Sequence, residues 1–120
     1  MGVSTLRDIC FDCSDPARMA AFWGSVLGYR VHGPSSENEA AAIVAPAGGM
    51  RIWFNPVPEP KVAKNRVHID INMPDQAEMD RLLSLGATAL EDIRDDDGTL
   101  FWTIMADPEG NEFCAFPAKS

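Results

Sequence analysis

The sequence predicts an α+β fold in which two βαβββ modules pack together and leave a cleft between them. The first observation is an internal repeat: when the chain is shifted by 58 positions, Asp12 falls on Asp70 and Gly28 falls on Gly86. The second is the pattern in each half, where an apolar run precedes a proline, a helical stretch and a closing Leu-Gly. The third is that short strands with one helix cannot bury a sheet face alone, so the halves must pack against each other or a second chain.

The first half contains one helix and four strands. An apolar run over residues 5–13 predicts a strand, after which Ser14 or Asp15 can cap a helix that has Pro16 at its first position. Apolar residues recur at helical spacing over 17–27, and Gly28 ends this helix. The remaining pattern predicts three strands and two turns, with strands at 29–32, 39–45 and 50–55 and turns at 33–36 and 46–49.

A proline-rich segment separates the halves. Three of the five residues at 56–60 are proline, which excludes a helix interior or a central strand and predicts a linker over 56–65. We therefore expect a single domain made of module one (1–55), this linker and module two (66–120). The second module is predicted to hold a helix at 75–85 closed by Gly86, hairpin turns at 95–98 and 107–111, and strands at 66–72, 88–92, 100–106 and 112–116.

Bulk properties exclude several classes of protein. The chain has 120 residues and a formal net charge of -8, which disfavours binding to nucleic acid or anionic membranes. No apolar run approaches the ~20 residues that span a membrane, and the start lacks a signal-peptide pattern, so we expect a cytoplasmic protein. The odd count of three cysteines argues against a disulfide framework. Cys10 and Cys13 form a C-x-x-C motif, but on a strand they would face opposite sides.

Several motifs together resemble one superfamily. They are Asp15-Pro16, Phe22-Trp23, Leu27-Gly28-Tyr29, Val67-His68-Ile69-Asp70 and Asp107-Pro108-Glu109-Gly110-Asn111-Glu112-Phe113. Together with the two βαβββ modules, these motifs resemble the vicinal oxygen chelate (VOC) superfamily, and within it the glyoxalase-like subgroup common in actinobacteria. The resemblance covers nearly the whole chain. It implies a curved mixed sheet around a cleft, as in glyoxalases and dihydroxybiphenyl dioxygenases, and a homodimer.

The resemblance also implies a divalent metal such as zinc, nickel, manganese or iron. In the superfamily the ligands are His, Gln or Glu at inward-facing strand positions. His68 occupies that position in the second module, and Asp8 is the matching candidate in the first, with Cys10 as its alternative. The usual carboxylate positions hold other residues: Arg51 or Trp53 in the first module and Cys114 in the second.

The residue types themselves favour a site around His68. An imidazole can bind a metal or transfer a proton near neutral pH. Asp70 lies two residues further on the same strand face, so the two could form a carboxylate–imidazole pair. The alternatives are that His68 only lines a pocket and that Asp70, like Asp12, caps the helix that follows. Cys10, His68 and Cys114 would suit zinc, and the alternative is that both cysteines are small buried hydrophobes.

The tryptophans divide by their surroundings. Trp23 lies at helical spacing with Met19 and is expected in the core. Trp53 and Trp102 lie in predicted strands, where they could line the cleft and stack on a flat ligand, although core packing is an equal alternative. Arg51 shares a strand face with Trp53 and could pair with an anionic group of a ligand.

These observations leave three functional hypotheses open. The chain is expected to bind a small organic molecule in the cleft, as a metal-dependent lyase, isomerase or dioxygenase of the glyoxalase-like type. Alternatively, it is a metal-free protein that sequesters an antibiotic-like molecule, similar to bleomycin resistance proteins. A third hypothesis is acid–base catalysis by His68 and Asp70 without a metal. Whether the protein is an enzyme stays open at this point.

Overall fold

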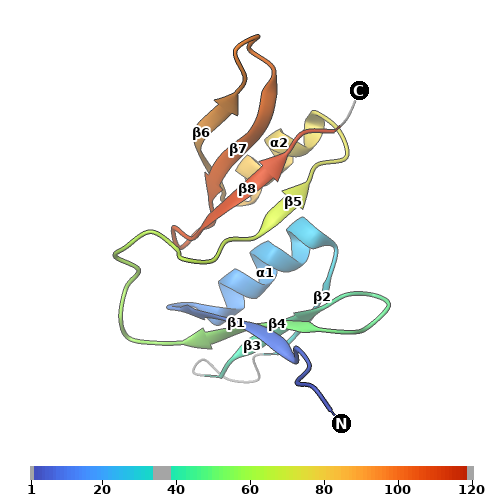
Figure 1. The fold of residues 1–120 in the computed structure, drawn as a ribbon. Helices are drawn as coiled ribbons and strands as arrows, with labels where there is room; N and C mark the ends of the chain where they lie inside the picture. Colours follow the sequence, from blue (N-terminus) through green and yellow to red (C-terminus); the bar gives the residue numbers. More distant parts are fainter. Residues whose placement is uncertain (1, 34–38, 119–120) are drawn as a thin grey trace. The chain divides into compact units, whose positions relative to one another are not determined.

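The computed structural model describes residues 2–33 and 39–118 and divides the chain into two compact units. The first unit is Met1–Pro60 and the second is Lys61–Ser120. Within the described residues, each contains one four-stranded mixed sheet and one helix in the order βαβββ, as the repeat predicts (Figure 1). Part of the turn expected at 33–36 lies outside the described residues.

The first unit pairs its first strand with its last. The sheet order is β1-β4-β3-β2, with β1 parallel to β4 and the other neighbours antiparallel. The predicted hairpin between the third and fourth strands is present. The elements are β1 (Asp8–Cys13), α1 (Pro16–Leu27), β2 (Arg30–His32), β3 (Ala41–Val44) and β4 (Arg51–Pro56).

The ends of α1 follow the sequence signals. The Asp15 carboxylate accepts a hydrogen bond from the Arg18 backbone N–H at 3.1 Å, and Gly28 ends the helix in the left-handed conformation at φ 69°. Trp23 is 1% exposed and makes an edge contact with Phe11, which confirms it as a core residue. The helix cap is therefore Asp15, and the alternative that Asp12 caps this helix is wrong.

The second unit repeats the topology with different strand lengths. Its order is β5-β8-β7-β6, with β5 parallel to β8. The strand expected at 66–72 is shorter, because the regular pairing with the last strand begins only at Asp70. Before it, the Asn65 side-chain amide donates to the Glu112 carbonyl. The elements are β5 (Asp70–Asn72), α2 (Ala77–Leu85), β6 (Thr88–Arg94), β7 (Leu100–Ala106) and β8 (Glu112–Phe116).

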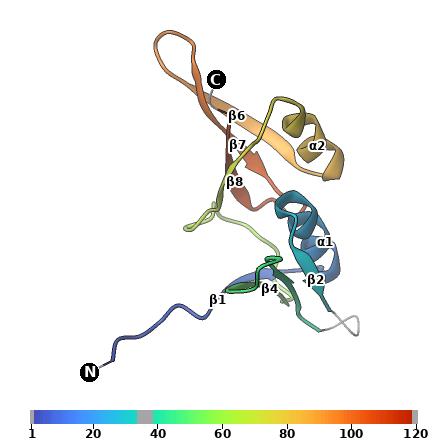
Figure 2. The ribbon, with the colours of Figure 1, turned by 90° about the vertical axis from the view of Figure 1, so that its right-hand side faces the viewer.

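Helix α2 lies along one side of this sheet in both views (Figures 1 and 2). It starts at Ala77, where the Asp75 carboxylate accepts from the Glu78 N–H at 3.1 Å, and it ends at Gly86. Asp70 therefore does not cap it, which corrects that alternative. No helix among residues 2–33 and 39–118 is long and apolar enough to cross a membrane.

Alternate residues of the second sheet face opposite sides, as the pleat of a strand requires. One set is buried and forms the core of the unit: Ile71, Thr103, Met105, Phe113 and Ala115. The opposite set carries the side chains of chemical interest: Asp70, Trp102, Ile104, Cys114 and Phe116.

The turn between β7 and β8 is built around the Asp107 carboxylate, which is 3% exposed. One of its oxygens accepts the backbone N–H groups of Glu109 and Asn111 at 2.9 Å, and the other accepts the Asn111 amide at 3.0 Å. Gly110 completes the turn at φ 88°. This confirms the structural role predicted for the segment and fixes where β8 begins.

Replacing Asp107 tests how much the turn contributes to stability. Asp107→Ala leaves two half-buried backbone donors without an acceptor, so we expect the free energy of unfolding to fall by about 2 kcal/mol in urea titrations. Asp107→Asn keeps one side-chain oxygen and should lose about half as much. An Asp107→Ala protein as stable as the wild type would contradict this account.

Candidate functional site

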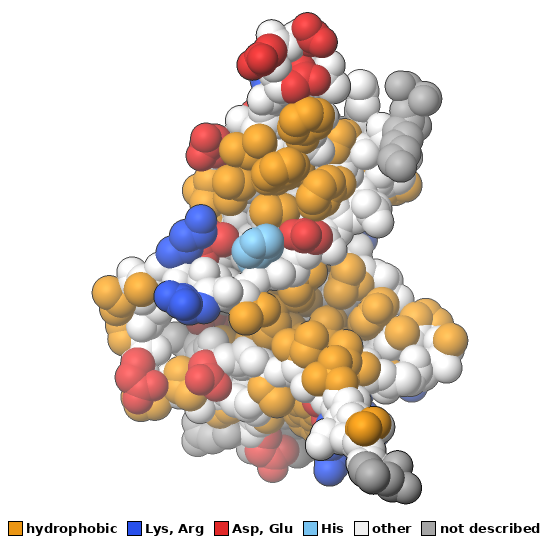
Figure 3. Space-filling model, viewed as in Figure 1, with side chains coloured by type: hydrophobic (Ala, Val, Ile, Leu, Met, Phe, Trp, Pro, Cys, Tyr) orange, Lys and Arg blue, Asp and Glu red, His pale blue; other side chains and the backbone are white. Residues whose placement is uncertain are grey.

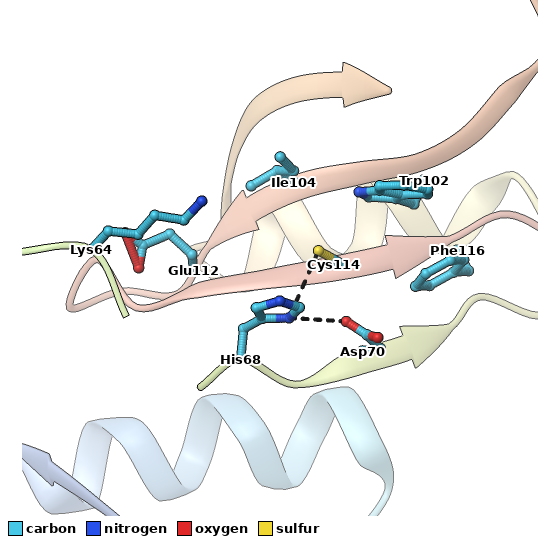
Figure 4. Close-up of a pocket in the computed structure, with 8 residues that line it drawn as sticks. All are labelled: Lys64, His68, Asp70, Trp102, Ile104, Glu112, Cys114 and Phe116. Carbon is cyan, nitrogen blue, oxygen red and sulfur yellow. Dashed lines mark hydrogen bonds and ion pairs between the residues drawn. The ribbon is translucent and has the colours of Figure 1, made fainter. Parts of the chain in front are cut away.

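The second unit contains a pocket of about 370 Å³, a volume in the range of small-molecule sites (Figure 4). Its residues come from β5, β7, β8 and the segment before β5. Figure 3 shows hydrophobic side chains gathered over this unit, with a histidine and basic side chains beside them. The lining residues are Lys64, His68, Asp70, Trp102, Ile104, Glu112, Cys114 and Phe116.

Strand register brings the central lining residues together. The parallel pairing of β5 with β8 sets Asp70 opposite Cys114, and the antiparallel pairing of β7 with β8 sets Ile104 opposite the same cysteine. Further along the strands, the rings of Trp102 and Phe116 lie 5.6 Å apart at 33°. The pocket therefore has a polar part around the cysteine and an aromatic wall beside it.

His68 lies just before β5 and uses one ring nitrogen for both of its contacts. Its Nδ1 is 3.1 Å from Asp70 Oδ1 and 4.0 Å from Cys114 Sγ. In a neutral imidazole the carboxylate makes Nδ1 the donor, so Nε2 is left as an acceptor for a proton or for a ligand's hydrogen bond. Because thiol and carboxylate approach the same nitrogen, the three do not form a relay from nucleophile to base to acid.

The Cys114 thiol is held in its protonated form. Burial raises its pKa, the nearby Asp70 raises it further, and Lys64 lowers it by a smaller amount. A thiol with a raised pKa is a poor nucleophile near neutral pH. We therefore interpret Cys114 as a small apolar lining residue unless a metal removes its proton.

His68, Asp70 and Cys114 also meet the first requirement of a metal site. One nitrogen, one oxygen and one sulfur atom lie within 4.8 Å of one another. Such a mixed set suits zinc, which takes three protein ligands and a water in open sites, better than Mn(II), which prefers oxygen. An ion would have to displace the protons of His68 Nδ1 and the thiol.

The candidates of the first unit form a separate cluster on β1 and β4. The carboxylate of Asp8 accepts from Trp53 Nε1 and from the Arg51 backbone N–H, both at 3.1 Å. The Arg51 guanidinium lies 5.9 Å from the centre of the Trp53 ring, and Cys10 is exposed on the same strand as Asp8. A joint site of Asp8 or Cys10 with His68, and the cleft between the modules, stay predictions.

Four lining residues were missed by the sequence reasoning. Ile104 lies two residues after Trp102 on β7, and Phe116 lies two residues after Cys114 on β8. Residues two apart share a face of a strand, so strand parity could have found both. Glu112 shares that parity. Lys64 carried no such signal, because it lies in a segment whose composition predicts only a linker.

Glu112 ties that segment to the sheet. Its carboxylate bonds Lys61 Nζ at 3.1 Å and the Asn65 backbone N–H at 3.2 Å. Burial raises the pKa of Glu112, but the hydrogen bonds from Asn65 and Lys61 outweigh it and leave the pKa below its ordinary value of 4.5. The segment 61–65, called the strap below, is therefore part of the second unit and forms one edge of the pocket.

Comparison with known families agrees with this fold. A family model described as a glyoxalase-like domain matches residues 8–116. No curated protein matches the chain.

Solved structures with the same fold cover nearly all of the chain. A glyoxalase/bleomycin resistance protein/dioxygenase family enzyme from Burkholderia phytofirmans PsJN is 15% identical, with a TM-score of 0.69 over 97% of this chain and 100% of its own. A mutant of the fosfomycin resistance protein FosX from Listeria monocytogenes, complexed with Mn(II) and a dihydroxypropylphosphonic acid, is 15% identical, with a TM-score of 0.72 over 98% and 93%. TioX from Micromonospora sp. ML1 is 17% identical, with a TM-score of 0.61 over 95% and 98%. The predicted α+β fold and the superfamily resemblance are confirmed.

The Glu112 contacts predict a pH-dependent contribution to stability. Because the folded pKa lies below 4.5, the stabilisation is present above pH 4.5 and is lost as pH falls through the folded pKa. Glu112→Gln should therefore lower the free energy of unfolding by about 1 kcal/mol at pH 7 and by a smaller amount at pH 3, where part of the Glu112 stabilisation has already been lost. Urea titrations at both values measure this, with exposed Glu91→Gln as the control. A loss of unfolding free energy in Glu112→Gln that is equal at both pH values would contradict a stabilising role for the ionised Glu112 carboxylate.

Proposed function

Because the chain belongs to the glyoxalase-like domain family, we propose that it binds a small organic molecule with a flat apolar portion in the pocket of the second unit. The observation that carries this proposal is the combination of an aromatic wall, Trp102 and Phe116, with polar groups at His68 and Asp70. Apolar walls with a few polar groups that fix orientation are typical of small-molecule sites. The wall supplies affinity, and His68 Nε2 supplies an acceptor for a hydrogen bond.

Metal-free binding is the role that the side chains support as they stand. His68 Nδ1 has its partner in Asp70, and the Cys114 thiol keeps its proton, so neither needs an ion to be satisfied. An antibiotic-like ligand is supported by the structural neighbours, which include a glyoxalase/bleomycin resistance protein/dioxygenase family enzyme and a fosfomycin resistance protein. A cytoplasmic location and a homodimer belong to the same proposal, supported by three free cysteines and by the family resemblance respectively.

Metal-dependent catalysis is the second candidate, and the His68, Asp70 and Cys114 cluster is the observation that favours it. These three residues would hold the ion. Once bound, a divalent metal would polarise an oxygen atom of the ligand, which is the step that a lyase, isomerase or dioxygenase of this type requires. The chain's own contribution would be to orient the ligand against Trp102 and to keep water away on the apolar side.

Ligand binding is tested with a neutral flat probe, naphthalene-2-carboxamide, by isothermal titration calorimetry. We expect saturable binding to the wild type and about tenfold weaker binding to Trp102→Ala, because the stacking surface is lost. Trp102→Phe should keep most of the affinity, and Trp53→Phe in the first unit should be unchanged. An absence of binding of both this probe and its carboxylate analogue, naphthalene-2-carboxylate, up to their solubility limits would refute the proposed function.

The metal candidate is tested by zinc titration of the chelator-treated protein, followed by elemental analysis. If it is correct, one zinc binds per chain, and His68→Ala and Cys114→Ser each weaken binding at least tenfold. Cys10→Ser is the matched control. Equal zinc affinity in the wild type and in both site variants would exclude a zinc site made of these residues.

A further inference from the structure

The pocket has an ammonium group at one end and an aromatic wall at the other (Figure 4). From this arrangement we infer that the ligand is an aromatic anion, whose acidic group binds Lys64 Nζ while its ring lies against Trp102 and Phe116. The inference rests on the proposed binding function and specifies its ligand class.

Lys64 is available for a ligand, unlike the other lysine of the strap. The Lys61 ammonium is committed to Glu112 at 3.1 Å, and it also donates to the Ala63 carbonyl. Across the part of the chain that the structure describes, Lys64 has no hydrogen-bond or ion-pair partner. A lining cation without a counter-ion is the simplest receptor for a carboxylate, phosphonate or sulfonate group.

The strap fixes the position of Lys64. On its C-terminal side, Asn65 donates its backbone N–H to the Glu112 carboxylate at 3.2 Å and its side-chain amide to the Glu112 carbonyl at 3.5 Å. On its N-terminal side, the Lys61–Glu112 ion pair anchors the chain, and the two side chains are only 22% and 17% exposed. Because the backbone is tied to β8 on both sides of Lys64, less entropy is lost when its side chain engages a ligand.

The two carboxylates of the pocket do not cancel this charge. Glu112 is neutralised by Lys61, and Asp70 lies beyond His68 from Lys64, toward Phe116 (Figure 4). The positive charge of Lys64 is therefore available at the strap, and it orients an anionic ligand with its acidic group toward the strap.

A matched pair of probes separates the charge from the ring. Naphthalene-2-carboxylate and naphthalene-2-carboxamide share size and shape but differ in charge, and calorimetry at low salt gives the affinity of each. We expect the wild type to prefer the carboxylate by about five- to tenfold, a modest ratio because Lys64 is solvent-exposed. Lys64→Met should abolish the preference by weakening only carboxylate binding, and Lys64→Arg should keep it. Arg66→Met, which removes a nearby exposed cation outside the pocket, is the control.

The outcomes distinguish the two proposals. Equal affinity of the wild type for both probes, or a carboxylate preference that survives in Lys64→Met, would overturn the aromatic-anion inference and leave small-molecule binding intact. Equal weakening of both probes by Lys64→Met would also overturn it, because the lysine would then only support the pocket's shape. Failure of both probes to bind the wild type would overturn the inference together with the proposed function.

Discussion

The parallel pairing of the first strand of each unit with its last is the constraint on which the rest of the structure depends. Parallel neighbours need a long crossover, and each unit supplies it with one helix and two strands. In the second unit the β5–β8 register sets Asp70 opposite Cys114, and without it His68 would have no thiol beside it. In the first unit the same pairing sets Asp8 opposite Arg51, so a different cluster occupies the equivalent place.

Signals that act over a few residues predicted much of this fold. The bounds of β7 and β8, the turn at Asp107 and the helix ends at Gly28 and Gly86 follow from strand alternation, turn residues and glycine conformations. The start of β5 and the role of the strap could not be predicted in this way. The strap depends on Glu112 and the start of β5 on its pairing with β8, both far along the chain, and no local pattern reports such contacts.

The candidate site could be predicted only in part, again because local patterns do not report contacts between distant residues. Strand parity correctly placed His68 and Asp70 on one side, but it could not show that the carboxylate and the Cys114 thiol converge on a single ring nitrogen. That convergence makes two possible roles of His68 Nδ1 mutually exclusive. Nδ1 either donates to Asp70, which makes Nε2 available to a ligand, or it would have to lose its proton to solvent before it could bind a metal ion.

The two helices, which repeat in sequence, differ in how firmly they are held. Helix α1 buries several side chains, including Met19, Phe22 and Trp23, whereas α2 buries only Leu82. A helix with so little buried area opens at a lower free-energy cost, so its amide hydrogens should exchange with solvent through local unfolding well before those of α1. Helix α2 is thus the less firmly held of the two helices, and a ligand that binds only when α2 is folded would slow this exchange in proportion to its saturation.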